Sequence, residues 1–235
     1  MSLGDAANLH TFVDAVRFIG DHPSFLATKA LEQLELSAAA LGLALLVALP
    51  LGIVLGHLHR GSALAIGTSI FGRALPSLVL IAAFLTVLGI GFLNNMVALA
   101  VLASGPILTN AFDGVDGVDR DVVEAARGMG MTGGQILRRV ELPLAIPLLF
   151  TGIRVAAVTV VATAPIAAIA GGGGLGDIIV NQASYRLSGV IGASLLVMLL
   201  SAAVFICLLG VQVAVTPRGL RSTSLVDNST RLERS

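Results

Sequence analysis

The residues best suited to polar chemistry lie in one stretch, Asp119–Pro143, which stands between long apolar runs. Within it, two small residues are surrounded by residues of opposite charge. The small residues are Ala125 and Ala126, and the charged ones are Glu124, Arg127, Arg138 and Arg139. Small residues let another backbone approach closely, and the charges offer ion pairs around that contact. The stretch therefore suits the docking of a partner. The alternative is an ordinary amphipathic loop that lies on lipid headgroups.

Two short helices are predicted within this stretch. Asp121 and Glu124 have the spacing of a capping box, and Asp119 is an alternative cap. Helix-favouring residues follow over 122–127, until Gly128–Gly130 stops the first helix.

The second helix has its own start signal. Thr132 and Gln135 repeat the capping-box spacing and predict a helix over 136–142. Pro143 is then predicted to start the next membrane span, at a position where a proline loses no hydrogen bond. The stretch 119–143 is therefore expected to form a helix–turn–helix elbow.

The rest of the chain has the composition of a membrane protein. Its 235 residues are 56% hydrophobic and 12% charged, with a mean hydropathy of +0.95, whereas soluble domains carry about 25% charged residues. The sequence predicts an all-α integral membrane protein with five transmembrane helices, at about 34–55, 65–90, 95–112, 144–170 and 187–215. The formal net charge is zero, so nothing indicates a nucleic-acid partner.

These spans divide the chain into three parts. The transmembrane domain covers 31–215. Segment 1–30 precedes it, and apolar residues at helical spacing predict an amphipathic helix on the membrane surface, with a loosely ordered leader as the alternative. Segment 216–235 is predicted to be a solvated tail.

Basic residues predict the orientation, because cytoplasmic loops carry the excess of Lys and Arg. One side of the membrane would hold nine of the fourteen, namely Arg60, Arg120, Arg127, Arg138, Arg139, Arg218, Arg221, Arg231 and Arg234. The other side would hold Arg17, Lys29 and Arg186. The chain is therefore expected in the cell (inner) membrane, with its N-terminus outside and both the elbow and the C-terminal tail in the cytoplasm.

The spacing within the elbow resembles the EAA motif of ABC-importer permeases. Glu124-Ala125-Ala126 is followed after three residues by Gly130, and after nine more by Val140-Glu141-Leu142-Pro143. The resemblance extends over about residues 30–215. The stretch Val123–Thr132 and the block Gly173–Asp177 are similar to the osmoprotectant branch, which carries glycine betaine, choline or carnitine. A methionine or other small-solute importer is the alternative.

The resemblance implies a five-helix core like that of the methionine importer, with the elbow as a coupling helix in a groove of a cytoplasmic ATPase. The residues implied to make that contact are Glu124, Ala125, Ala126, Arg127, Gly128, Gly130, Val140, Leu142 and Pro143. The chain itself would not be an enzyme, and ATP and Mg would bind the ATPase. The other implied partners are a second copy or a sister permease, an extracytoplasmic substrate-binding protein and membrane lipid.

Further candidates lie outside the elbow. Arg73, Pro76 and Arg154 fall in the apolar spans and are candidates for the pathway or a subunit interface, although Arg73 could equally reach the membrane surface. The glycine block 171–176 fits G-x-G-x-x-G, but no βαβ pattern surrounds it, so nucleotide binding is rejected. The block predicts a sharp turn and an outer gate, through Gly171, Gly173, Gly174 and Gly176. No metal site is predicted.

The aromatic residues are few. The chain has no Trp, one Tyr and nine Phe, whereas quaternary ammonium groups are bound by aromatic cages. This chain could assemble a cage only from scattered Phe and Tyr185, so selectivity for a betaine is predicted to lie on a separate binding protein.

An ATP-independent secondary transporter or channel is the alternative from a different class. Such a protein needs acidic residues within its spans. The predicted spans carry none beyond Glu35, at the edge of the first.

Overall fold

The computed structural model describes residues 3–60, 67 and 76–216, and all regular structure in this part of the chain is helical. The α-helices are α1 (Leu3–Asp21), α2 (Pro23–His57), α4 (Ser77–Leu88), α5 (Phe92–Asp116), α6 (Arg120–Gly128), α7 (Gly133–Ile136), α8 (Leu142–Thr163), α9 (Gly176–Val180) and α10 (Gln182–Val215). A π-helical turn, Leu137–Glu141, joins α7 to α8, and a 3₁₀ segment, Ala164–Ala170, follows α8.

Within the described residues, four helical stretches are long and apolar enough to cross a membrane: Pro23–His57, Phe92–Asp116, Gly133–Ala170 and Gln182–Val215. They correspond to four of the five predicted spans. The remaining span, predicted at about 65–90, is represented by α4, which has 12 residues and is about 18 Å long. Residues 65–66 and 68–75 of that span, which include Arg73, lie outside the described residues.

The first spanning helix begins earlier than predicted. α2 has 35 residues and starts at Pro23, so the predicted boundary at 30/31 falls inside a continuous helix. Ahead of it, α1 is a helix. Of the two alternatives for segment 1–30, an amphipathic helix and a loosely ordered leader, the structure has the helix. α1 packs against α10, where Ala15 is fully buried and approaches Gly192.

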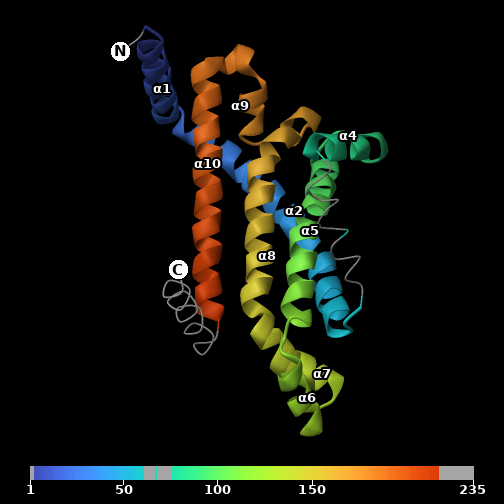
Figure 1. Ribbon diagram of the computed structural model, residues 1–235. Helices are drawn as coiled ribbons and strands as arrows, with labels where there is room; N and C mark the ends of the chain where they lie inside the picture. Colours follow the sequence, from blue (N-terminus) through green and yellow to red (C-terminus); the bar gives the residue numbers. More distant parts are fainter. Residues whose placement is uncertain (1–2, 61–66, 68–75, 217–235) are drawn as a thin grey trace, which may run out of the picture.

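Small residues allow the central helices to pack closely. α5 lies between α2 and α8 (Figure 1). A methyl group added to Gly52 of α2 would meet the Leu108 carbonyl of α5 at 2.7 Å. One added to Gly152 of α8 would meet the Pro106 carbonyl of α5 at 2.8 Å. Close backbone approach through small residues is typical of helix packing in membranes.

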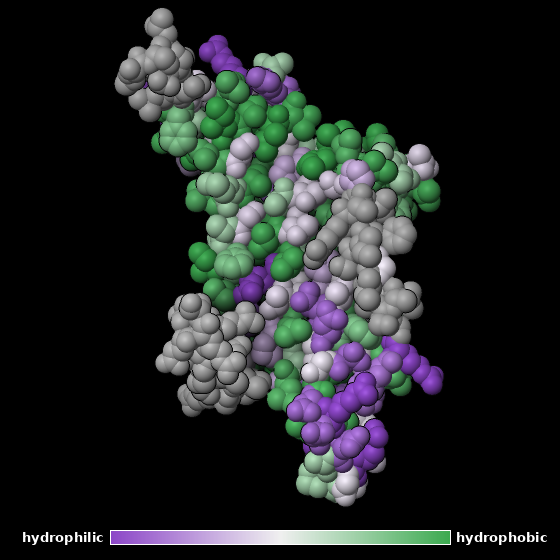
Figure 2. Space-filling view, viewed as in Figure 1, coloured by the Kyte–Doolittle hydropathy of each residue, from purple (hydrophilic) through white to green (hydrophobic). Residues whose placement is uncertain are grey.

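The two ends of the helical body differ in character. At one end, α6 and α7 project beyond the long helices, and at the other lie α1, α9 and the glycine block (Figure 1). Hydrophobic side chains cover most of the body, while hydrophilic ones gather around the projecting end (Figure 2). We call these the elbow end and the glycine end.

The last helix contains a break at its beginning. Arg186 has φ 55° and ψ 178°, so it is not helical although helix continues on both sides of it. The predicted start of the last span at residue 187 coincides with this break. Arg186 therefore marks the place where α10 leaves the glycine end and enters the apolar body.

Candidate functional site

The elbow, residues 119–143, begins with a capped helix. The Asp119 side chain accepts a hydrogen bond from the backbone N–H of Asp121 at 2.9 Å. Of the two predicted caps, Asp119 is therefore the one that starts α6. α6 ends at Gly128, and Gly130 has φ 83°, which turns the chain toward α7.

A small hydrophobic core of its own holds the elbow together. Its buried residues are Val118, Val123, Ala126 and Ile136, with Met131 and Val140 packed against them. Ala126 is only 2% exposed, so its small side chain serves packing inside the elbow. Ala125 lies on the opposite, exposed face, together with Glu124, Arg127, Gly128 and Gly130. The EAA residues thus divide between the core and the free surface.

The second half of the elbow differs from its prediction. The capping box at Thr132 is present, and the Thr132 backbone N–H donates to Gln135 Oε1 at 2.8 Å. The helix it starts, α7, has only four residues and continues through the π turn into α8. The prediction of a separate helix that ends before Pro143 was wrong. A proline cannot donate to the carbonyl four residues before it and crowds that carbonyl, so we attribute the wider turn to Pro143.

A buried contact between a carboxylate and a histidine fixes the root of the elbow to α2. Glu141, in the π turn, is 1% exposed. Its Oε2 lies 2.5 Å from Nδ1 of His57, at the end of α2. This contact was missed by the sequence reasoning, because the two residues are 84 positions apart and His57 looked like a polar flank of a span.

A second, more exposed pair lies beside the first. His59 Nδ1 is 2.7 Å from Asp116 Oδ1, at the end of α5. Next to it is a pocket of about 220 Å³, lined by His59, Arg120, Val123, Glu124 and Arg127. The elbow end therefore offers a recess with both charge signs, directly beside the exposed face of α6.

At the other end, the glycine block forms a tight turn. Gly171, Gly173 and Gly174 have φ between 70° and 76°, a region in which other residues are strained. Gly176 has an ordinary φ but no room for a side chain, since an added methyl carbon would lie 2.2 Å from the Pro165 carbonyl oxygen. The predicted sharp turn after the fourth span is confirmed.

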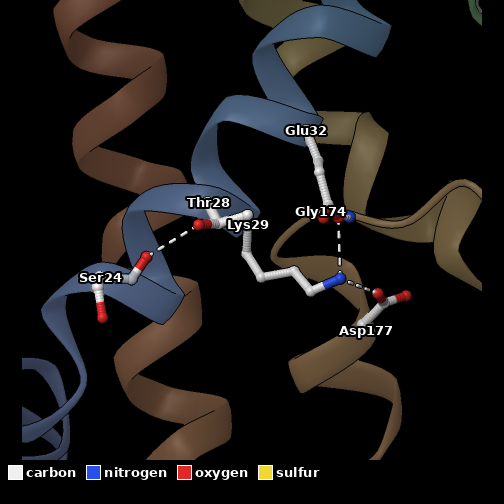
Figure 3. A network of polar contacts seen from close by, with 6 residues as sticks. All are labelled: Ser24, Thr28, Lys29, Glu32, Gly174 and Asp177. Carbon is white, nitrogen blue, oxygen red and sulfur yellow. Dashed lines mark hydrogen bonds and ion pairs between the residues drawn. The ribbon is translucent and has the colours of Figure 1, made fainter.

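Charged residues from α2 hold this turn in place. Lys29 Nζ lies 2.8 Å from Glu32 Oε2 and 2.7 Å from Asp177 Oδ2. The same Glu32 oxygen accepts a hydrogen bond from the Gly174 backbone N–H at 3.0 Å. Figure 3 shows the Lys29 side chain extending from α2 toward Asp177, across the gap that separates the two segments. We call these four residues the turn clamp.

Replacing Lys29 by methionine should loosen the turn clamp. The side chains of Lys29, Glu32 and Asp177 are 19%, 40% and 37% exposed, so water screens the pair and the expected loss is about 1 kcal/mol. Hydrogen exchange in a peptide that covers the glycine block should become about fivefold faster. Elbow peptides should be unchanged, and Arg17→Met, which removes an exposed cation from α1, serves as the control. Unchanged exchange in the glycine block would contradict the clamp.

The remaining candidates are dispersed. Arg154 of α8 donates from Nη1 to Gln212 Oε1 at 2.8 Å, and its guanidinium carbon lies 5.0 Å from the Phe205 ring centroid. Gln212 and Phe205 both belong to α10, so Arg154 joins two helices of this chain. Pro76 precedes α4 as its N-cap residue. The structure does not bring Pro76 and Arg154 together in one site.

The fold and the elbow define a class of protein. Long apolar helices, close small-residue packing and a projecting polar helix pair are the features of a polytopic membrane protein. Residues 48–221 match the family described as "Binding-protein-dependent transport system inner membrane component". The chain belongs to this family of ABC-transporter permeases.

Individual proteins support the same assignment. The glycine betaine/carnitine/choline transport system permease protein OpuCB of Bacillus subtilis (strain 168) is 36% identical over 205 residues, which cover 87% of this chain and 94% of that protein. The choline transport system permease protein OpuBB of the same organism is 35% identical over 207 residues, covering 88% of this chain and 95% of that protein.

Solved structures support the fold. The inward-facing MetNI methionine ABC transporter has a TM-score of 0.71 at 23% identity, covering 83% of this chain and 99% of that chain. The chain therefore has the MetNI-type permease fold.

Proposed function

We propose that this chain forms half of the translocation pathway of an ATP-driven importer, and that its elbow docks on a cytoplasmic ATPase subunit. The observation that carries the proposal is that the elbow has one buried face and one exposed, charged face. Val123 and Ala126 hold it together from inside, while Glu124, Ala125 and Arg127 stay exposed beside a recess. An exposed, charged and internally braced helix of this kind is suited to rigid docking.

The elbow end is assigned to the cytoplasm. Five of the nine basic residues on the predicted inner side lie in or next to the elbow, namely Arg60, Arg120, Arg127, Arg138 and Arg139. The three on the opposite side, Arg17, Lys29 and Arg186, lie in α1, at the start of α2 and at the start of α10. This asymmetry supports an N-terminus outside the cell and a cytoplasmic C-terminal tail.

The connections of the elbow indicate how docking would drive transport. α5 leads into the elbow from one side, and α8 leaves it through the π turn without a break. When two ATPase subunits close on ATP, a rotation of each elbow would therefore be carried into α5 and α8. Two permease chains, identical or sister, would open the pathway alternately to each side. ATP and Mg would be bound by the ATPase, and this chain would carry out no catalysis.

The proposed cargo is an osmoprotectant such as glycine betaine, choline or carnitine. The support comes from relatives that span almost the whole chain and whose names state these substrates. An extracytoplasmic binding protein would deliver the cargo to the glycine end, where the turn clamp would form part of an outer gate. Uptake of labelled glycine betaine tests the cargo, and methionine uptake without betaine uptake would contradict it.

Charge reversal on the elbow tests the docking. Glu124→Arg should reduce the amount of ATPase retained on the purified permease by at least about tenfold, since a well-placed interface charge pair contributes more than about 1.4 kcal/mol. Uptake should fall in parallel. Asp14→Arg, an exposed reversal on α1 at the opposite end, should leave both unchanged. If Glu124→Arg retains the ATPase and transports normally, the docking assignment fails.

A further inference from the structure

A pocket with aromatic walls lies at the glycine end, where α1, the start of α2 and the start of α10 meet. Its volume is about 480 Å³, within the range of about 300–1,000 Å³ that small-molecule sites occupy. The lining residues are Phe18, His22, Phe25, Ser184, Tyr185, Arg186 and Ser188. None of them belongs to the elbow or the turn clamp.

Three aromatic rings meet in this pocket around the only tyrosine of the chain. Tyr185 stacks on Phe25 with ring centroids 6.0 Å apart, and meets Phe18 edge-on at 6.4 Å. The His22 ring adds a fourth surface, 4.8 Å from that of Phe18. All three aromatic side chains are partly exposed, so their faces are not fully occupied by protein packing. The packing therefore brings together Tyr185 and two of the scattered Phe residues, the residue types from which the sequence allowed a cage.

Arg186 supplies a positive charge on the same pocket. It is exposed and holds φ 55°, a left-handed conformation that is costly for a residue with a side chain. Such strain persists where the surrounding structure over-determines it, and it occurs often at ligand sites. Among the described residues no ion pair to Arg186 is found. Within this part of the chain the guanidinium is available to an anionic group.

We propose that this pocket is a low-affinity receiving site for a trimethylammonium zwitterion. The rings of Phe18, Phe25 and Tyr185 would hold the quaternary ammonium group through cation–π attraction. Arg186 would bind the carboxylate at the other end of the molecule. For glycine betaine or carnitine as ligand, the inference rests on the proposed function and places a first contact for the cargo on the permease itself. The phosphocholine headgroup of a lipid carries the same two charges and is the other possible source.

The single tyrosine makes the pocket directly observable. The full-length chain, labelled with 3-fluorotyrosine in a maltoside detergent, should give one ¹⁹F resonance, from Tyr185. Glycine betaine should shift it saturably, with half-saturation on the order of 1 mM. Glycine, which has the carboxylate but no methyl groups, should cause no shift. Absence of a saturable shift with betaine, or an equal shift with glycine, would overturn the proposal.

Variants distinguish binding of the quaternary ammonium group from binding of the carboxylate. Phe25→Leu should weaken betaine binding about tenfold, while Phe12→Leu, an exposed α1 residue outside the pocket, should not change it. Arg186→Gln should weaken betaine about tenfold but leave tetramethylammonium binding unaltered. An equal loss for both ligands in Arg186→Gln would overturn the assignment of Arg186 to the carboxylate.

Two further measurements are needed. The first distinguishes a lipid headgroup from free cargo as the ligand, and the second distinguishes failure of the pocket proposal from failure of the proposed cargo. Glycerophosphocholine that binds more tightly than betaine would assign the pocket to a lipid headgroup, and the reverse order would assign it to free cargo. Betaine uptake by cells carrying the wild-type chain is measured separately. Uptake without a shift overturns the pocket alone, whereas a shift without uptake overturns the proposed cargo alone.

Discussion

Replacing His57 by leucine is expected to destabilise the root of the elbow by about 3–5 kcal/mol, because it leaves a buried carboxylate without its partner. The side chain of Glu141 is only 2% exposed and that of His57 25%. Their separation of 2.5 Å joins the end of α2 to the π turn that leads into α8. Hydrogen exchange in a peptide covering 137–143 should become at least a hundredfold faster, unless the whole chain unfolds first, which thermal unfolding in detergent will report.

The neighbouring pair provides a matched control. His59 and Asp116 are 39% and 38% exposed, at a similar separation of 2.7 Å. Exposed pairs contribute about 1 kcal/mol or less, so His59→Leu should have a much smaller effect than His57→Leu. A similar loss of stability in the two variants would show that the burial of the pair does not determine how much it contributes to stability.

The double variant tests whether the cost is that of an unpaired charge. His57→Leu combined with Glu141→Leu replaces both partners by apolar groups, and such replacements are often neutral or stabilising. The double variant should therefore recover most of the stability lost in His57→Leu. If it is no more stable than the single variant, the unpaired carboxylate is not the source of the loss.

The functional consequence of this pair follows from its position. The elbow reaches α8 through the π turn, and Glu141 is the last residue of that turn. The contact with His57 adds a lateral connection from the same turn to α2. If the elbow docks as proposed, a displacement of it would reach both α8 and α2. In the His57→Leu protein we expect the ATPase to remain bound while uptake falls, since the exposed docking face is unchanged.

Local signals were the part of the fold that could be predicted from the sequence. The start of α6 at Asp119, the capping box at Thr132 and the turn at the glycine block depend on residues within a few positions of one another. The four long helices follow from the length and hydropathy of the apolar runs. These features need no knowledge of how distant segments meet.

Features that depend on distant contacts could not be predicted. The first membrane span was predicted from residue 34, whereas the helix that contains it, α2, already begins at Pro23 and includes Lys29 and Glu32. The structure keeps both in the helix by pairing Lys29 with Asp177, 148 positions away. Likewise, Phe18, Phe25 and Tyr185 look scattered until the packing of α1 on α10 brings them together.

A methyl group added at Gly176 is expected to be among the most damaging small changes in the chain. Its carbon would lie 2.2 Å from the Pro165 carbonyl oxygen and 2.8 Å from Ala168 Cβ. The nearest atom belongs to backbone, so no side-chain rotation can relieve the contact. Gly176→Ala should therefore lower the free energy of unfolding by about 3 kcal/mol, the upper part of the usual range for overpacking. Thermal unfolding of the purified permease measures this loss.

Gly210→Ala provides the comparison, because the same chemical change there meets nothing within 4 Å. Gly210 lies within α10, where alanine favours the helix by about 1 kcal/mol over glycine. The two variants should therefore shift the unfolding temperature in opposite directions. The 3₁₀ segment and α9 meet at Gly176, so the damage should extend to the turn clamp and appear as faster hydrogen exchange at Gly174. A Gly176→Ala protein as stable as Gly210→Ala would mean that the glycine block tolerates a backbone shift, and the close packing argued for this turn would be wrong.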